Sequence, residues 1–340
     1  MVQLGTRIEP RPVPPRAPAT RVLITGTFLA GLLAILVGRW WTGTGYVAAP
    51  AGLPDPGWVT AVGLPVAQYT HEIAGITVVG LLFLRCAALP ASTGPGGAHL
   101  LEMAARWAWI WVAGTVAWIT LTVSELTGAP VDDLLRSPDL VLAAAGTDRV
   151  LAETATLWVA LAVALFVGRL PTAPPVAALL LAATAALLPS ALTGHAGHHD
   201  SPTIAMLALA VHLAAAAAWV GGLLALVVHL RPFPDELRRA LPRFSAAALM
   251  CMLAVGSAGI VEGVVTLRTW TALWVSDRGH LILAKTVGLA VLAAIGYAHR
   301  KRTLGPAGTG RLAPLLSLAA GELLIMGATT GLAVILSTTG

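Results

Sequence analysis

The stretch TIAMLALAVHLAAAAAWVGGLLALVVHL (residues 203–230) decides the fold class, because it contains no Asp, Glu, Lys or Arg. About 20 predominantly apolar residues cross the hydrocarbon core of a bilayer as an α-helix. A helix satisfies its backbone hydrogen bonds internally, and this stretch lacks the alternating pattern of barrel strands. We therefore expect residues 203–230 to form a transmembrane helix.

The rest of the chain has the same character. Of its 340 residues, 57% are hydrophobic and 11% are charged, and the mean hydropathy is +0.81. Soluble globular domains carry about a quarter charged residues. The sequence predicts an all-α, polytopic membrane bundle of about nine transmembrane helices. The predicted spans are 21–39, 64–89, 106–125, 149–169, 174–193, 203–230, 243–266, 279–299 and 314–338.

Arginine and lysine predict the orientation of the bundle, because cytoplasmic loops are enriched in both. If the N-terminus is cytoplasmic, the inner segments hold fifteen of these residues and the outer segments five. This bias predicts an extracytoplasmic C-terminus and a multi-pass protein of the cytoplasmic (inner) membrane. It also accounts for the net charge of +5 without a nucleic-acid partner. Residues 1–20, rich in Pro and Arg, are predicted to be a disordered cytoplasmic segment.

Several ionisable residues fall inside the predicted spans, where they are costly and usually functional. At a rise of about 1.5 Å per residue, they lie at similar depths in the outer half of the membrane. They are His71, Glu72, His212, Glu262 and Lys285, with Glu153 near the same level and His280 at the outer mouth. This common depth predicts one polar cavity open to the outside.

The loop TGHAGHHDS (193–201) places His195, His198 and His199 on the same outer side, and Met206 follows it. Imidazole, carboxylate and thioether groups together bind copper and other late transition metals. Alternatively, His71 and His212 could ligate a haem iron from facing helices, as in b-type membrane cytochromes. The residues leave both chemistries open.

Four stretches in order resemble CopD-type copper-resistance membrane proteins. They are SALTGHAGHHD (190–200), HLAAAAAWVGGLLAL (212–226), LPRFSAAAL (241–249) and GHLILAKTVGLAVLAAIGYAHRKR (279–302). The family's Gly-His-Ala turn corresponds to residues 194–196, and its His-x6-Trp-x-Gly-Gly pattern begins at His212. Lys285 stands at the family's helix lysine, and Glu322 fits its Glu-containing last helix. The chain is similar to the long actinobacterial members, without the CtaG-like domain that some of them carry.

The resemblance implies copper transport or delivery at the cytoplasmic membrane, usually uptake from outside, and no enzymatic activity. It implies a CopC-like extracytoplasmic copper carrier and cytochrome oxidase assembly proteins as possible partners. The open alternatives are a haem b protein and a copper chaperone for a respiratory oxidase. Residues 21–200 would form a five-helix region and 201–340 a CopD-like four-helix region. The predicted copper ligands are His71, Glu72, His195, His198, His199, Met206, His212, Glu262 and His280.

Overall fold

The structure is a computed structural model that describes residues 18–43, 46–50, 52–89, 94–170, 173–189 and 202–266, and scattered positions between 271 and 334. Every regular element in this part of the chain is helical, which confirms the all-α prediction. Six helices there are long and apolar enough to cross a membrane. The main helices are α1 (Pro18–Thr42), α2 (Gly57–Phe83), α3 (Pro95–Thr127), α6 (Asp148–Phe166), α7 (Ala173–Ala185), α9 (Pro202–Leu224) and α10 (Pro234–Thr266).

Short elements extend or join these helices. The π-helices η1 (Leu84–Ala88) and η4 (Ala225–His229) continue α2 and α9, and the 3-10 helix η2 (Val167–Arg169) ends α6. The acidic loop between α3 and α6 folds into α4 (Val131–Leu134) and α5 (Pro138–Ala145), which the sequence analysis did not predict. Since Pro138 and Asp139 begin α5, its start follows the usual preferences of a helix N-terminus.

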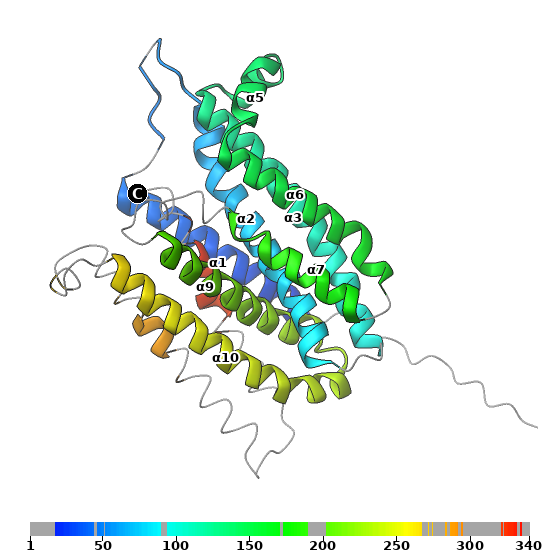
Figure 1. Cartoon of the computed structure of the whole chain (residues 1–340). Helices are drawn as coiled ribbons and strands as arrows, with labels where there is room; N and C mark the ends of the chain where they lie inside the picture. Colours follow the sequence, from blue (N-terminus) through cyan, green and yellow to red (C-terminus); the bar gives the residue numbers. More distant parts are fainter. Residues whose placement is uncertain are drawn as a thin grey trace, which may run out of the picture.

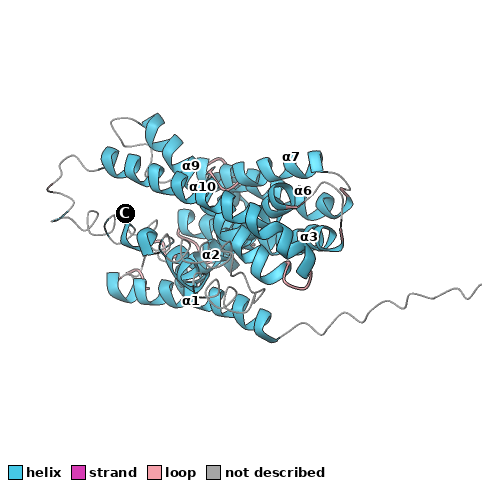
Figure 2. Ribbon diagram, turned by 90° about the horizontal axis from the view of Figure 1, so that it is seen from below, coloured by secondary structure: helices cyan, strands magenta, loops and turns pink. Residues whose placement is uncertain are grey.

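Helix α2 lies in the middle of the bundle. It packs against α1, α3, α7 and α9, while α6 packs on α3 and α10 packs on α9. Figure 1 shows α3 and α6 on one side of α2 and α9 with α10 on the other, and Figure 2 shows α2 enclosed by the other helices. The α2 side chains are therefore buried around much of the helix, and a polar side chain on α2 must find its partner inside the protein.

Two glycines allow α2 and α9 to cross closely. A Cβ atom on Gly80 would overlap the carbonyl carbon of Gly221, and one on Gly221 would overlap the carbonyl oxygen of Ile76. Small residues are common where membrane helices approach backbone to backbone. The segment 323–331 meets α1 in a similar way, since Gly327 and Gly331 have no room for a side chain against Thr27 and Gly31.

The two ends of the bundle differ in charge. Successive antiparallel helices place η1, the start of α3, η4 and the start of α10 at one end. That end has Arg85, Arg106, Arg169, Arg231, Arg238, Arg239 and Arg243. The opposite end is acidic, with Asp55, Glu125, Asp132, Asp133, Asp139 and Asp148. This separation agrees with the arginine-based orientation, which stays a prediction.

The loop before α2 is organised by Asp55. Its carboxylate accepts hydrogen bonds from the backbone N–H of Gly57 at 2.8 Å, the Tyr46 hydroxyl at 2.8 Å and the backbone N–H of Ala49 at 3.1 Å. These bonds favour the ionised form, so the pKa of Asp55 lies below its ordinary value. Arg39 at the end of α1 also donates to the carbonyl of Ala61 at 2.8 Å. Both interactions fix the connection between α1 and α2 at the acidic end.

The predicted spans compare well with the described helices. The first four, the sixth and the seventh each fall on a long helix, although α3 begins at Pro95 rather than at 106. The fifth corresponds to the shorter apolar helix α7. The eighth and ninth lie largely outside the described residues, where positions 286–291 and 323–331 are helical. Residues 1–17 of the predicted disordered segment also lie outside them.

Candidate metal centre

His71 is the most enclosed of the predicted ligands that the structure describes. It sits on α2 with 1% of its surface exposed. Two indole rings of α3 meet its ring edge-on, with centroid distances of 6.0 Å to Trp111 and 4.7 Å to Trp118. Gly114, between them, approaches the backbone of His71 so closely that its own Cβ would lie 3.0 Å from the His71 nitrogen. Helix α3 therefore holds the imidazole in a narrow, largely apolar slot.

A hydrogen-bond chain defines the tautomer of His71. The Thr115 hydroxyl donates to the carbonyl of Trp111 at 2.7 Å, one turn back on α3. Its single proton is thereby used, so Thr115 accepts the hydrogen bond of 2.8 Å from Nδ1 of His71. The Nδ1 atom consequently carries the proton, and in the neutral ring Nε2 has a free lone pair. A second partner that fixes the tautomer in this way is typical of metal-ligating histidines.

Glu153 faces that lone pair from α6. Its Oε2 lies 4.0 Å from Nε2 of His71, and the side chain is 1% exposed. Neither carboxylate oxygen of Glu153 has a hydrogen-bond partner among the described residues. Arg149 attracts this carboxylate and Glu72 repels it. A buried carboxylate without a hydrogen-bond partner is costly inside a membrane unless it is protonated or paired with a cation.

The spacing of the pair suits a bound ion better than a direct hydrogen bond. A hydrogen bond between a ring nitrogen and an oxygen spans about 2.7–3.2 Å. Transition-metal bonds to His nitrogen and to carboxylate oxygen are each about 2.0–2.2 Å long. A distance of 4.0 Å therefore accommodates one ion that binds both atoms. Thr115 and Glu153 lie opposite the two ring nitrogens of His71.

Of the other predicted ligands, some have side chains that the structure describes and some do not. Glu72, half-buried beside His71 on α2, accepts a hydrogen bond of 3.1 Å from Gln68. On α9, His212 is half-buried and Met206 is 40% exposed. Glu262 lies in the last turns of α10, but its side chain is not among those described. The residues His195, His198, His199 and His280 lie outside the described residues, as do Lys285 and Glu322.

Within the described part of the chain, no group of three or more His, Cys, Asp or Glu side chains is placed to hold a metal ion. The polar contacts of His71 there run to α3 and α6, not to α9 or α10. The carboxylate that faces His71 belongs to Glu153. The sequence analysis placed Glu153 near the same depth but did not include it among the predicted ligands. His99 and His229 were also missed. His99 lies just before the predicted span 106–125, and His229 lies at the end of the span 203–230. Both positions belong to the arginine-rich end of the bundle, and this common location could have suggested that the two residues are neighbours.

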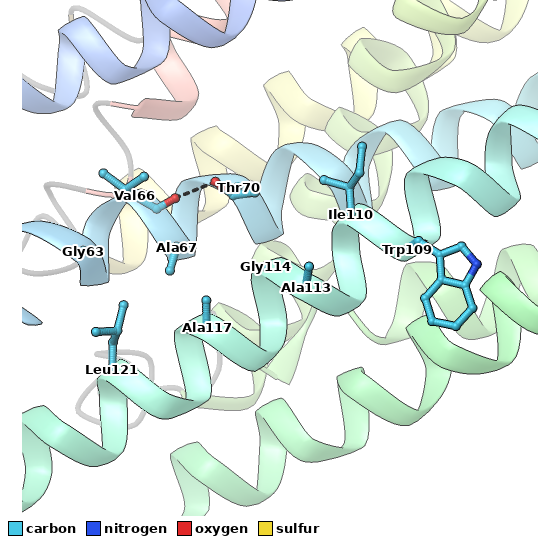
Figure 3. A pocket seen from close by; sticks show the side chains of 10 residues that line it. All are labelled: Gly63, Val66, Ala67, Thr70, Trp109, Ile110, Ala113, Gly114, Ala117 and Leu121. Atoms are coloured by element: carbon cyan, nitrogen blue, oxygen red, sulfur yellow. Dashed lines mark hydrogen bonds between the residues drawn. The ribbon is translucent and has the colours of Figure 1, made fainter. Parts of the chain in front are cut away.

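A separate apolar groove lies on the outer face of the α2–α3 pair (Figure 3). Its volume is about 560 Å³, and its side chains are mainly small or aliphatic. The lining residues are Gly63, Val66, Ala67, Thr70, Trp109, Ile110, Ala113, Gly114, Ala117 and Leu121. The Thr70 hydroxyl is occupied by the Val66 carbonyl at 2.8 Å. The groove therefore has the lining of a lipid-facing surface, and His71 does not line it.

Comparisons with known proteins agree with the sequence motifs. The family model described as Copper resistance protein D matches residues 238–336, and that of the Copper resistance protein D-like N-terminal domain matches residues 59–203. A "Copper transport protein CutJ" of Bacillus subtilis (strain 168) is 30% identical over 118 residues, which are 33% of this chain and 22% of that protein. The chain thus matches less than a quarter of this relative's length.

No solved structure matches the chain. The two family models together cover more than two thirds of the chain. The first region includes both His71 and Glu153, and the second includes most of α10. Six described helices are long and apolar enough to cross a membrane. The chain belongs to the CopD family of copper-resistance membrane proteins.

Proposed function

We propose that this protein transports copper across the membrane, or delivers it there, and holds the ion between His71 and Glu153. The observation that carries the proposal is the pair itself. An imidazole lone pair and an unpartnered carboxylate face each other across 4.0 Å, each on a side chain that is 1% exposed. A cation between them would compensate the burial of the carboxylate and bind the lone pair at once.

Copper suits this donor pair, and the family of the chain supports copper as the cargo. Imidazole is a good ligand for copper, whereas a carboxylate alone would favour Mg²⁺, Ca²⁺ or Mn²⁺. The faces and edges of Trp111 and Trp118 exclude water from the slot, so an ion there must exchange its hydration shell for protein ligands. A site with only two strong protein ligands binds and releases an ion more readily than a closed four-ligand cage.

We propose uptake as the direction. The acidic end of the bundle, with Asp132, Asp133 and Asp139 near its surface, would raise the local concentration of cations. The histidine loop 193–201 and Met206 would then capture copper before it enters the bundle. An ion that leaves at the arginine-rich end would pass to an acceptor on that side. A CopC-like carrier outside and oxidase assembly proteins remain possible partners in this scheme.

The test is copper flux into proteoliposomes that contain the purified full-length protein. Glu153→Gln removes the negative charge and keeps the shape of the side chain, and His71→Gln removes the imidazole. Each variant is expected to lower the initial rate of copper entry about tenfold or more, because loss of even an outer partner of a metal ligand costs roughly 10–100-fold. The rate is measured with a copper-responsive chelator sealed inside the vesicles.

The matched control is Glu102→Gln on α3. Glu102 is 56% exposed and pairs with Arg106 at the helix surface, so this substitution should leave flux unchanged. Wild-type flux in Glu153→Gln vesicles with equal protein content would refute the assignment of the ion to this pair. Absence of copper flux from the wild-type protein itself would refute transport as the function.

A further inference from the structure

A second group of metal-ligating side chains lies at the arginine-rich end of the bundle. His99 is in the second turn of α3, and His229 is the last residue of η4. Their ring centroids are 6.3 Å apart, with an angle of 50° between the planes. The ring of Phe233 packs on His99 with a centroid distance of 5.3 Å. The two imidazoles thus come from segments 130 residues apart and meet where α3 begins and η4 ends.

The neighbouring indole shows which nitrogen of His229 carries the lone pair. Trp107 Nε1–H donates to Nε2 of His229 at 3.2 Å. A nitrogen that accepts a hydrogen bond is unprotonated, so Nε2 holds the lone pair of the neutral ring and faces α3. The bond is at the long end of the normal range, and a neutral hydrogen bond of this kind has a small net free energy. A cation can therefore displace the indole at low cost.

Local structure keeps His229 in this position. It is 6% exposed and closes a π-helical turn, a feature that occurs frequently at functional sites. His99 is half-buried. The Glu236 carboxylate lies against the start of α3, where it leaves no room for a side chain on Gly94 or Gly96. The Arg85 side chain lies against the same turn, with its Nε 3.4 Å from the position of a Cβ on Gly97, so the case for a cation rests on the two imidazoles and not on local charge.

We propose that His99 and His229 form a second site for a late transition-metal cation, through Nε2 of His229 and a ring nitrogen of His99. Two imidazoles bound to one ion at about 2.0 Å each place their ring centres roughly 6 Å apart, close to the 6.3 Å observed. The site needs no contribution from His71 or Glu153. His99 lies sixteen residues before Thr115 on α3, so the two sites are about 24 Å apart along the helix. Only the identification of the ion as copper rests on the proposed function.

The test uses Cu(I) and the purified full-length protein under reducing conditions, with a chromogenic chelator as competitor. His99→Ala and His229→Ala are each expected to lower the bound copper by one ion per chain, whereas Glu153→Gln removes a different ion. Bound Cu(I) is also expected to protect His99 from acylation by diethyl pyrocarbonate, read by mass spectrometry at that residue. The two sites can therefore fail or succeed independently.

Trp107→Phe separates a metal site from a purely structural cluster. The variant keeps an aromatic ring but removes the N–H that competes for Nε2, so it should tighten Cu(I) binding at this site about two- to tenfold. Unchanged stoichiometry in His99→Ala, or weaker binding in Trp107→Phe, would overturn the proposal. Because His99 is half-buried, its replacement by alanine is tolerated more easily than that of His229, which keeps the test valid if His229→Ala does not fold.

Discussion

At the scale of single residues, the protonation of His71 is set by a threonine that need not touch the ion. Thr115 can only accept from His71, because its own proton goes to the Trp111 carbonyl. Without this arrangement the neutral imidazole could carry its proton on Nε2 and turn a donor toward Glu153. Metal binding would then require a tautomer change. The threonine is thus a positioning residue for the proposed copper site.

Thr115→Val is expected to weaken copper binding at His71 by about 10–100-fold while the bundle stays folded. Valine keeps the branched shape but cannot accept the hydrogen bond from Nδ1–H of His71. The matched control is Thr122→Val on the same helix, because Thr122 is buried and its hydroxyl has no hydrogen-bond partner among the described residues. Chelator competition on both variants provides the comparison, and equal affinities would show that Thr115 does not orient the ligand.

At the scale of elements, the close crossing of α2 and α9 is the most sensitive contact. Gly80→Ala would place a methyl group in overlap with the backbone of Gly221, and a backbone atom cannot turn aside as a side chain can. Forced overpacking of this kind costs about 1–3 kcal/mol. We expect a lower midpoint of thermal unfolding in detergent and loss of copper flux, since α2 carries His71.

Gly259→Ala in α10 is the control for that substitution. A Cβ atom there meets nothing within 4 Å, and alanine has a higher helix propensity than glycine by about 1 kcal/mol. Its unfolding midpoint should be unchanged or higher. If both variants unfold at the wild-type temperature, the α2–α9 crossing is looser than the structure shows.

The same elements explain which features the sequence could reveal. Long uncharged runs predicted the membrane helices, because a lipid-crossing helix must be apolar along its length. The start of α3 was missed, since His99, Glu102 and Arg106 interrupt its apolar pattern before the membrane proper. The pairing of His71 with Glu153 was also beyond the sequence, because 82 residues separate them and depth alone does not give helix rotation or neighbours. Adjacent positions differ by about 100° on a helix, which is why Glu72 turns to Gln68 instead.

At the scale of the whole molecule, the charge distribution and the two histidine sites follow one axis. The acidic end, the His71–Glu153 pair and the His99–His229 pair succeed one another from one end of the bundle to the other. His71, His99 and Glu153 lie in the region that matches the N-terminal domain model. His229 lies between the two matched regions, and none of these four residues lies in residues 238–336. The proposed sites thus draw on the first matched region and on α9 with η4, and not on the second matched region.

The central claim is that copper binds between the imidazole of His71 and the carboxylate of Glu153. X-ray absorption at the copper edge tests it most directly, on His99→Ala protein loaded with one copper ion per chain. We predict a first shell of nitrogen and oxygen at about 2.0 Å with one imidazole, and a changed spectrum in the His99→Ala, Glu153→Gln double variant. A sulfur shell at about 2.3 Å, from Cys86 or Cys251, or a spectrum that Glu153→Gln leaves unaltered, would contradict the account.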